Sequence, residues 1–522
     1  RQGETDKSEA EAAQVKRAGL LLLLCLLLPP GLWCRTADAA AATASFDTAA
    51  AASVWSAALT YIAPRALNPV TIPQMTMWGL NGLAALDPNL NTALQDGEIR
   101  LYGPDRLLAA LPAPPPTDAA GWGQAAAQVA LAAYNASPAL RLAGTQGIIG
   151  NFFDELFNHF DPYSRYESPV QAAQDQLMIT GLGGTGLTLA AKGGRVVIGA
   201  VAADSPAADI GLQPGMLVTQ VNGRAAYPSM VEALNNAMPG LPGSKLSLSV
   251  AEAGQPPQAL TLTRGFIPPQ TVFTEPDLAP GIAMLKISGF NKGTGDQFAQ
   301  ALAGVMAQTP PPSALVLDLR GNRGGVLRQA VLVADSLLQS GPIAETNGRD
   351  PDADQAFKAE GADLTNGARL AVLVDGQTAS AAEILSSALA DDGRAVVIGS
   401  ETLGKGLVQT VTALPDGGEL YVTWSRVLAP RGWPLQGMGV MPQICTSNGP
   451  QALNQQLAAL AQGRNLQSPV LAQARAVRAP VSIDRILALR SACPADIGGA
   501  LDEQAAIALL SNPEMYQAAL LH

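Results

Sequence analysis

The sequence predicts a mixed α/β protein in which a layered core follows a helical region and a β-rich module. Three successive residue patterns indicate this order. Apolar residues are first spaced as in helices, then gather in short runs between Gly and Pro, and finally alternate between strand-like and helix-like runs. The last pattern is typical of a largely parallel sheet covered by helices. The expected parts are a signal segment over 1–39, a helical region over 40–170, a β-rich module over 176–266, an α/β core over 267–449 and a helical tail over 450–522.

The composition excludes several functional classes. With 522 residues, 48% of them hydrophobic and 14% charged, the chain is long and apolar enough for two or three globular domains. A net charge of -11 argues against a nucleic-acid-binding surface, which needs a basic stripe to neutralise phosphates. If Cys25 and Cys34 leave with a signal segment, the remaining Cys445 and Cys493 and the two histidines, His159 and His522, cannot build a common zinc site. We therefore expect neither a metal nor another cofactor.

The first forty residues are patterned like a secretory signal. Two basic residues precede the apolar run 18–28, and small residues ending at Ala39 follow two prolines. Because the run is too short to span a bilayer, it predicts export, to a periplasm, with cleavage near Ala39. The alternative is an uncleaved membrane anchor. Cys445 and Cys493 would remain after cleavage; an oxidising compartment favours a disulfide between them, although two buried thiols give the same pattern.

The spacing of apolar residues then changes from one part of the chain to the next. Residues 45–166 have mostly helical spacing, and "FDPYSRYE" (160–167) ends this region as a turn. Short strands such as "GRVVIGAV" and "GMLVTQVNG" fill the next ninety residues or so. From Gly281 onward the strand-like runs "GIAMLKI", "ALVLDLRG", "LAVLVDG" and "AVVIGS" alternate with helical runs. In such a sheet, ligands bind at the carboxyl ends of the strands.

The turn "DGQTASAAEI" (375–384) places Ser380 where a helix begins. Serine is a common helix cap, and this turn alone favours that interpretation. A nucleophilic serine needs a base, and neither histidine is suitably placed. Lys405, between two glycines in "ETLGKGLVQ", follows the next strand, and a desolvated lysine can be neutral near pH 7 and accept a proton. Gln409, four residues on, is expected to share a strand face with Lys405.

The run "DLRGNRGG" (318–325) ends another buried strand at the same sheet edge. Gly324 or Gly325 would expose a backbone N–H there, and the N–H of Ala381 would supply a second donor for an oxyanion hole. The pattern does not choose between the two glycines. A plain strand-to-helix turn would give the same residues.

Several motifs together resemble the carboxyl-terminal processing, or tail-specific, serine proteases. They are "DLRGNRGG", "DGQTASAAEI", "ALADDGRAVVIG", "ETLGKGLVQ" and "YVTWSRVLAPRGWPLQGMGVMP", in that order, and the resemblance covers residues 160–443. It implies that Ser380 is the nucleophile and that Lys405, twenty-five residues later, is the base. It also implies that Gln409 holds the lysine in place and that Asp391 fills an acidic position that some members need.

The β-rich module resembles a PDZ domain. "GLGGTGLTL" (181–189) is similar to its carboxylate-binding loop, and "SPAADIGLQPGMLVTQVNG" to its helix-turn-strand segment. Successive N–H groups of a glycine-rich turn can form a nest for a C-terminal carboxylate, beside which the tail adds as a strand. The resemblance implies that the carboxylate-binding residues are Gly183, Gly184, Thr185, Gly186 and Leu187.

The expected protein is thus an exported serine endopeptidase that binds apolar C-terminal tails through a PDZ domain and cleaves them with a Ser/Lys dyad. Its partners would be protein or peptide substrates and no nucleic acid, with membrane association only through an uncleaved signal. The alternative is a catalytically silent PDZ-containing binding or scaffold protein on the same fold. The pattern does not indicate an oligomeric state.

Overall fold

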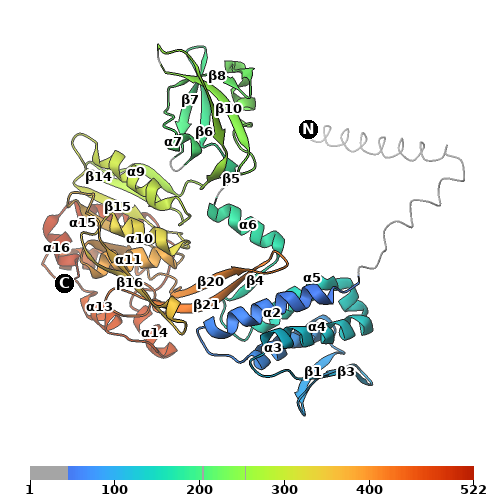
Figure 1. The fold of residues 1–522 in the computed structure, drawn as a ribbon. Helices are drawn as coiled ribbons and strands as arrows, with labels where there is room; N and C mark the ends of the chain where they lie inside the picture. Colours follow the sequence, from blue (N-terminus) through green and yellow to red (C-terminus); the bar gives the residue numbers. More distant parts are fainter. Residues whose placement is uncertain (1–44, 181, 203–204, 253, 522) are drawn as a thin grey trace, which may run out of the picture.

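A computed structural model of the chain describes residues 45–180, 182–202, 205–252 and 254–521. The predicted mixture of helices and sheets is confirmed. Figure 1 shows a group of N-terminal helices, a small β module and a core with the C-terminal helices against it. The expected signal segment, with its cleavage site near Ala39, lies outside the described residues. Among the helices that are described, none is both long and apolar enough to cross a bilayer.

Four helices form the body of the N-terminal part. They are α2 (Thr48–Arg65), α3 (Ile72–Leu86), α4 (Ala119–Ala136) and α5 (Pro138–Phe157). Fully buried Trp55 and Trp122 lie between α2 and α4, and Trp55 stacks on Phe152 of α5 with ring centroids 4.5 Å apart. Burial of several aromatic side chains gives this part a core of its own.

A three-stranded antiparallel sheet interrupts these helices, which departs from the helical expectation for this stretch. Its strands, in the order β1-β2-β3, are β1 (Asn91–Gln95), β2 (Glu98–Tyr102) and β3 (Leu107–Pro112). Asp96 and Gly97 have φ values of 53° and 77°, as the central residues of a two-residue hairpin require. An Asp-Gly pair is therefore the sequence signal for this hairpin.

The β module is one antiparallel sheet with two short helices. The sheet has the order β11-β10-β8-β7-β6. Its strands are β6 (Leu187–Lys192), β7 (Arg195–Val201), β8 (Leu217–Val221), β10 (Lys245–Ala251) and β11 (Gln258–Thr263), with β9 (Arg224–Ala225) beside β8; the helices are α7 (Pro206–Asp209) and α8 (Val231–Asn235), the latter preceded by the 3₁₀ turn η1 (Pro228–Met230). At its base, β5 (Leu182–Gly184) pairs with β12 (Gly265–Ile267), so the module enters and leaves the chain through one two-stranded stem.

The core contains a six-stranded sheet of order β13-β14-β15-β18-β19-β22. The strands are β13 (Val272–Ala279), β14 (Ile282–Ile287), β15 (Ala314–Asp318), β18 (Arg369–Val374), β19 (Ala395–Gly399) and β22 (Ile444–Cys445), and all but β13 are parallel. Helices α9 (Thr294–Met306), α10 (Leu327–Asp335) and α11 (Ala381–Asp391) cover one face. Three C-terminal helices, α12 (Gly449–Leu460), α15 (Ala500–Leu510) and α16 (Pro513–Ala519), cover the other. Two covered faces explain why every residue of β15 and β19 is buried.

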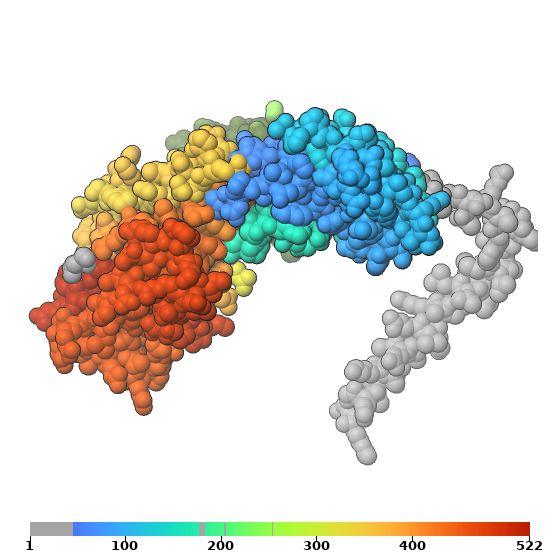
Figure 2. All heavy atoms as spheres, turned by 90° about the horizontal axis from the view of Figure 1, so that it is seen from below, coloured from blue at the N-terminus to red at the C-terminus, as the bar shows by residue number. Residues whose placement is uncertain are grey.

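A second sheet joins the core to the N-terminal helices. It consists of β16 (Gly341–Gly348), β17 (Gln355–Ala359), β20 (Leu407–Ala413), β21 (Glu419–Leu428) and β4 (Arg165–Glu167), with the 3₁₀ turn η2 (Pro351–Ala353) between β16 and β17. The β20–β21 hairpin reaches to α2 in Figure 1, and Leu420 and Val422 of β21 are buried in the N-terminal core. Helix α6 (Pro169–Thr180) follows β4 and leads to the β module. Seen from below in Figure 2, the N-terminal helices and the C-terminal part form two lobes that meet at an angle.

The C-terminal tail folds as five helices against the core. They are α12 (Gly449–Leu460), α13 (Ser468–Arg475), α14 (Ile483–Arg490), α15 (Ala500–Leu510) and α16 (Pro513–Ala519). Of the two alternatives left by the sequence, the structure has a disulfide between Cys445 and Cys493. The disulfide connects β22 to the segment between α14 and α15. The tail is therefore fixed next to the carboxyl end of the parallel sheet.

Candidate active site

Ser380 lies at the sharp turn between β18 and α11. Its φ of 56° and ψ of -117° are unusual for a residue with a side chain, a form of local strain that concentrates at functional sites. The Asp375 side chain fixes the turn by accepting hydrogen bonds from the N–H groups of Gln377, Thr378 and Gly321, each at 3.0 Å. The half-buried Ser380 makes no side-chain capping hydrogen bond. Its hydroxyl is thus positioned by the turn without being used to cap the helix.

The fully buried carboxylate of Glu383 connects Ser380 to Lys405. One oxygen, Oε2, accepts hydrogen bonds from the Ser380 N–H at 2.7 Å and from the Lys405 N–H at 2.9 Å. The other oxygen accepts from the Thr402 hydroxyl and from the Gly404 N–H at 2.7 Å. Burial raises the pKa of Glu383, and the four donors oppose the rise. Because one atom binds both N–H groups, the backbones of Ser380 and Lys405 are neighbours despite their separation in sequence.

Lys405 is half-buried and lies over an aromatic ring. Its Nζ is 4.9 Å from the centroid of the Tyr163 ring, a distance suited to a cation–π contact. Burial is the main cause that lowers the pKa of Lys405; the charge of Arg165 lowers it further and that of Glu383 raises it. Among the described side chains, no hydrogen bond joins the Lys405 ammonium to the Ser380 hydroxyl. The backbones of the two residues are thus close together, while the Lys405 ammonium lies over the Tyr163 ring.

The Gln409 side chain, expected to hold Lys405 in place, is bonded to other groups in this structure. Its amide donates to the Thr423 hydroxyl at 3.1 Å and to the Leu407 carbonyl at 3.3 Å. A register shift between Val408 and Gln409 interrupts the pairing of β20 with β21. The extra residue of this irregularity, Trp424, lies on β21, so Gln409 pairs directly with Thr423. Among the described residues, no hydrogen bond joins the Gln409 amide to the Lys405 ammonium.

The Gly-Gly loop after β15 touches the Ser380 turn. A Cβ on Gly324 would lie 2.7 Å from the Ser380 Cβ, and one on Gly325 would lie 2.1 Å from the Phe290 carbonyl oxygen, so neither position has room for a side chain. The Gly324 N–H donates to the Asn322 side chain at 2.8 Å. Within the described part of the chain, the N–H groups of Gly325 and Ala381 have no hydrogen-bond partner. These two are the donors left for an oxyanion.

Comparison with known proteins identifies the family. The profile of peptidase family S41 matches residues 281–446. The carboxy-terminal-processing protease of Bartonella bacilliformis is 30% identical over 303 residues, which are 57% of this chain and 69% of that protein. The chain belongs to peptidase family S41. The carboxyl-terminal-processing protease of Synechocystis sp. is 33% identical over 289 residues, covering 54% of this S41 peptidase and 67% of that protein. The S41 peptidase described here is accordingly an enzyme of the serine-peptidase type.

A solved structure is similar over more of the chain. The photosystem II D1 C-terminal processing protease is 25% identical, with 70% of this S41 peptidase and 92% of that chain covered and a TM-score of 0.34.

Asp391, which the resemblance placed at an acidic position that some members need, lies at the far end of α11 in this S41 peptidase. It is the last residue of α11, eleven residues from Ser380, so about 16 Å of helix separates the two. Its buried carboxylate accepts hydrogen bonds from Arg475 Nε at 2.7 Å and from Trp433 Nε1 at 2.8 Å. Asp391 therefore anchors α11 to the C-terminal tail and to the loop after β21. This contact could not be predicted from the sequence, because Arg475 is far away in the chain.

The expected carboxylate-binding loop of the S41 peptidase lines a pocket of about 520 Å³ in the β module. Gly183 and Gly184 belong to β5 and pair with the stem strand β12, which leaves Thr185, Gly186 and Leu187 to form the turn. The Thr185 and Gly186 carbonyls accept from Ala207 and Ala202. Because C=O and N–H point in opposite directions across a trans peptide, the N–H groups of Gly186 and Leu187 point away from these partners.

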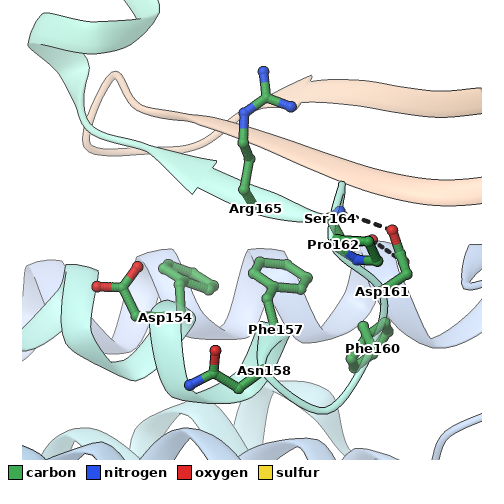
Figure 3. Close-up of a pocket in the computed structure, with 9 residues that line it drawn as sticks. Asp154, Phe157, Asn158, Phe160, Asp161, Pro162, Ser164 and Arg165 are labelled. Carbon is green, nitrogen blue, oxygen red and sulfur yellow. Dashed lines mark hydrogen bonds between the residues drawn. The ribbon is translucent and has the colours of Figure 1, made fainter. Parts of the chain in front are cut away.

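Another pocket, of about 610 Å³, lies between α5 and β4, and Figure 3 shows its lining. Its rim includes Pro162 and Ser164, the neighbours of Tyr163. Asp161 fixes this turn by accepting from the Ser164 hydroxyl at 2.7 Å and the Ser164 N–H at 3.0 Å, the bonds drawn in Figure 3. None of the expected site residues lines this pocket. Its relevance to the site is that the same turn carries the ring under Lys405.

Sequence reasoning missed two residues of the site, Glu383 and Tyr163. A signal existed for Glu383, since Ser-x-x-Glu at a helix start is the pattern of a reciprocal cap. Tyr163 has no comparable signal, because its contact with Lys405 depends on the pairing of β4 with β21. The site thus combines residues from the core with one from the turn that ends the N-terminal helices.

Proposed function

We propose that this S41 peptidase is a Ser/Lys endopeptidase that captures apolar C-terminal tails of proteins with its β module and cleaves them with Ser380 as the nucleophile. The observation that carries the proposal is the Glu383 carboxylate, one oxygen of which accepts from the N–H groups of both Ser380 and Lys405. A buried carboxylate with four donors is a rigid link. It supports a nucleophile and a base that work side by side in a chain with two histidines.

In the proposed reaction, neutral Lys405 accepts the hydroxyl proton as Ser380 Oγ attacks the scissile carbonyl. The N–H groups of Ala381 and Gly325 donate to the oxyanion that develops. The tetrahedral intermediate collapses to an acyl-enzyme, and Lys405 passes its proton to the leaving amine. Water then adds to the ester with Lys405 again accepting a proton, which releases the acid product and frees the Ser380 hydroxyl. The Lys405 side chain has to turn from the Tyr163 ring to Ser380 for these steps.

The β module is proposed to act as a PDZ domain. The N–H groups of Gly186 and Leu187 would bind the terminal carboxylate, and the pocket lined by Leu187, Met238 and Ile267 would take an apolar last side chain. We further propose that the protein works after export, because a disulfide such as Cys445–Cys493 persists in an oxidising compartment.

The test uses a small folded protein extended by an unstructured tail with apolar C-terminal residues. Ser380→Ala and Lys405→Ala are each expected to lower its cleavage at least about 1000-fold, since both remove a group that takes part in bond exchange. Cleavage is followed by mass spectrometry of the products. Lys358→Ala is the matched control, because Lys358 is an exposed lysine of β17.

Cleavage at the wild-type rate by either variant would overturn the dyad. If the folded wild-type protein cleaves unstructured peptides but leaves the tailed substrate intact, tail capture is overturned. Circular dichroism and thermal unfolding of each variant separate a loss of chemistry from a loss of fold.

A further inference from the structure

Asn235, the last residue of α8, has its side-chain amide bonded to the backbone of β6. Its Nδ2 donates to the Leu189 carbonyl at 2.9 Å, and its Oδ1 accepts from the Leu189 N–H at 2.7 Å. One side-chain amide therefore forms the pair of hydrogen bonds that a residue of a neighbouring β-strand would form with Leu189. Asn235 imitates a peptide unit at this point.

The bonded groups of Leu189 are the ones that a further strand would use. The sheet order β11-β10-β8-β7-β6 leaves β6 at an edge. Leu189 lies opposite Ile198 of β7, whose own N–H and C=O bond to Met216 and Gly215 on its other side. The Leu189 N–H and C=O accordingly point away from β7, into the groove beside α8. Because backbone groups alternate along a strand, those of Leu187 point the same way.

A substrate tail would meet Asn235 soon after its own C-terminus. The carboxylate-binding turn ends at Leu187, and the pocket beside it is open, with Asn235 at its wall. An extended tail that pairs with the sheet edge has its last residue opposite Leu187, and the residue two before the last opposite Leu189. The Asn235 amide already occupies the hydrogen-bonding position opposite Leu189 that this residue of the tail would use.

We propose that Asn235 is a built-in competitor of the substrate tail: a tail gains strand pairing beyond its last two residues only by displacing the Asn235 amide from Leu189. The inference deepens the proposed capture of C-terminal tails and rests on it. Since two hydrogen bonds are exchanged for two, strand addition at Leu189 contributes little to affinity. Recognition then depends on the terminal carboxylate and on the last side chains.

The test compares short and long peptides by calorimetry. The full chain carries Ser380→Ala so that peptides are not cleaved, and the peptides have two or eight residues with the same apolar C-terminal sequence and a free carboxylate. For the parent protein, in which Asn235 is present, the dissociation constants of the short and the long peptide are expected to lie within about twofold of each other. With Asn235→Ala, the eight-residue peptide is expected to bind about three- to tenfold more tightly, whereas the affinity of the two-residue peptide, which ends before Leu189, is expected to be unchanged. Asn236→Ala, an exposed neighbour, is the control.

Hydrogen exchange supplies a second measurement. The Leu189 amide of the unliganded protein is expected to exchange faster in Asn235→Ala and at the wild-type rate in Asn236→Ala. Equal affinity of the eight-residue peptide for Asn235→Ala and for the parent protein, or an unchanged exchange rate at Leu189, would overturn the inference and leave tail capture standing. If no variant binds the peptide with a free C-terminal carboxylate more tightly than the same peptide with an amidated C-terminus, tail capture and the inference both fail.

Discussion

At the residue scale, Lys405, the proposed base, shows how the surroundings of a lysine change its pKa. Burial lowers its pKa, and Arg165 adds to the effect from β4, a strand that belongs to the N-terminal part of the chain. Glu383 acts in the opposite direction, yet its carboxylate is bonded to the backbone at Ser380 and Lys405. The same carboxylate that positions the two residues therefore limits how far the pKa of Lys405 falls.

Arg165→Met is expected to move the alkaline rise of the cleavage rate to higher pH. Without the Arg165 charge the pKa of Lys405 rises, so a smaller fraction is neutral near pH 8 and the rate there falls. The measurement is the single-turnover rate between pH 6 and pH 10, compared with Arg349→Met, which removes a cation elsewhere. A midpoint that stays at the wild-type pH in Arg165→Met would show that the titrating base is not Lys405.

At the element scale, the two ends of helix α11 have different surroundings: one carries the proposed nucleophile and the other a buried ion pair. Its first turn carries Ser380 and Glu383, whereas its last residue, Asp391, holds Arg475 of α13 and Trp433. Sequence similarity identifies an acidic residue at position 391, but it does not indicate how far this residue lies from Ser380 in the folded protein. Only the folded positions separate the two roles.

Asp391→Ala is expected to lower the free energy of unfolding by about 3 kcal/mol or more, because it leaves the buried Arg475 guanidinium unpaired. The pH–rate midpoint of the remaining activity is expected to be unchanged, since Asp391 does not contact the reacting groups. Urea unfolding and a pH–rate profile check the two parts.

The double variant Asp391→Ala with Arg475→Leu is expected to recover part of the lost stability, because no charge then remains buried without a partner. A shifted pH–rate midpoint in Asp391→Ala would contradict a purely structural role.

The fold was predictable from sequence wherever the signals are local. The parallel sheet follows from apolar runs such as the one over β15, and the turn before α11 follows from small residues ahead of a helical pattern. Contacts that depend on distant segments were not predictable. Tyr163 under Lys405 and the hydrogen bond from Gln409 to Thr423 both arise from how β4, β20 and β21 pair.

At the scale of the whole molecule, the buried carboxyl group of Glu401 lies where the C-terminal tail contacts the loop that carries Lys405. Glu401 precedes Thr402 in the loop that carries Lys405, and its nearest cation is Arg490 of α14, at 3.8 Å. Burial raises the pKa of Glu401 to about 8; Arg490 and Arg475 oppose the rise and Glu383 adds to it. One of its oxygens has no hydrogen-bond partner among the described residues. Folding therefore favours the protonated form of Glu401.

This predicts a stability that falls as pH rises. Between the ordinary carboxyl pKa of 4.5 and about 8, the folded chain keeps a proton at Glu401 that the unfolded chain has released, so the free energy of unfolding falls by up to about 1.4 kcal/mol per pH unit from this group. Glu401→Gln is expected to remove that part of the slope, and Glu360→Gln, at an exposed position, to leave it. Urea unfolding from pH 5 to pH 8.5 measures the difference; equal slopes for the two variants would disprove the assignment.

The two-stranded stem formed by β5 and β12 has a consequence for how such a protein can arise and be altered. Because the β module begins and ends at adjacent points, it can be removed or exchanged as a cassette without moving the segments on either side. A short bridge from residue 182 to residue 267 would restore the chain in one step. Tail preference could in this way be acquired, lost or replaced during evolution independently of the hydrolytic machinery, and the same junction is open to protein engineering.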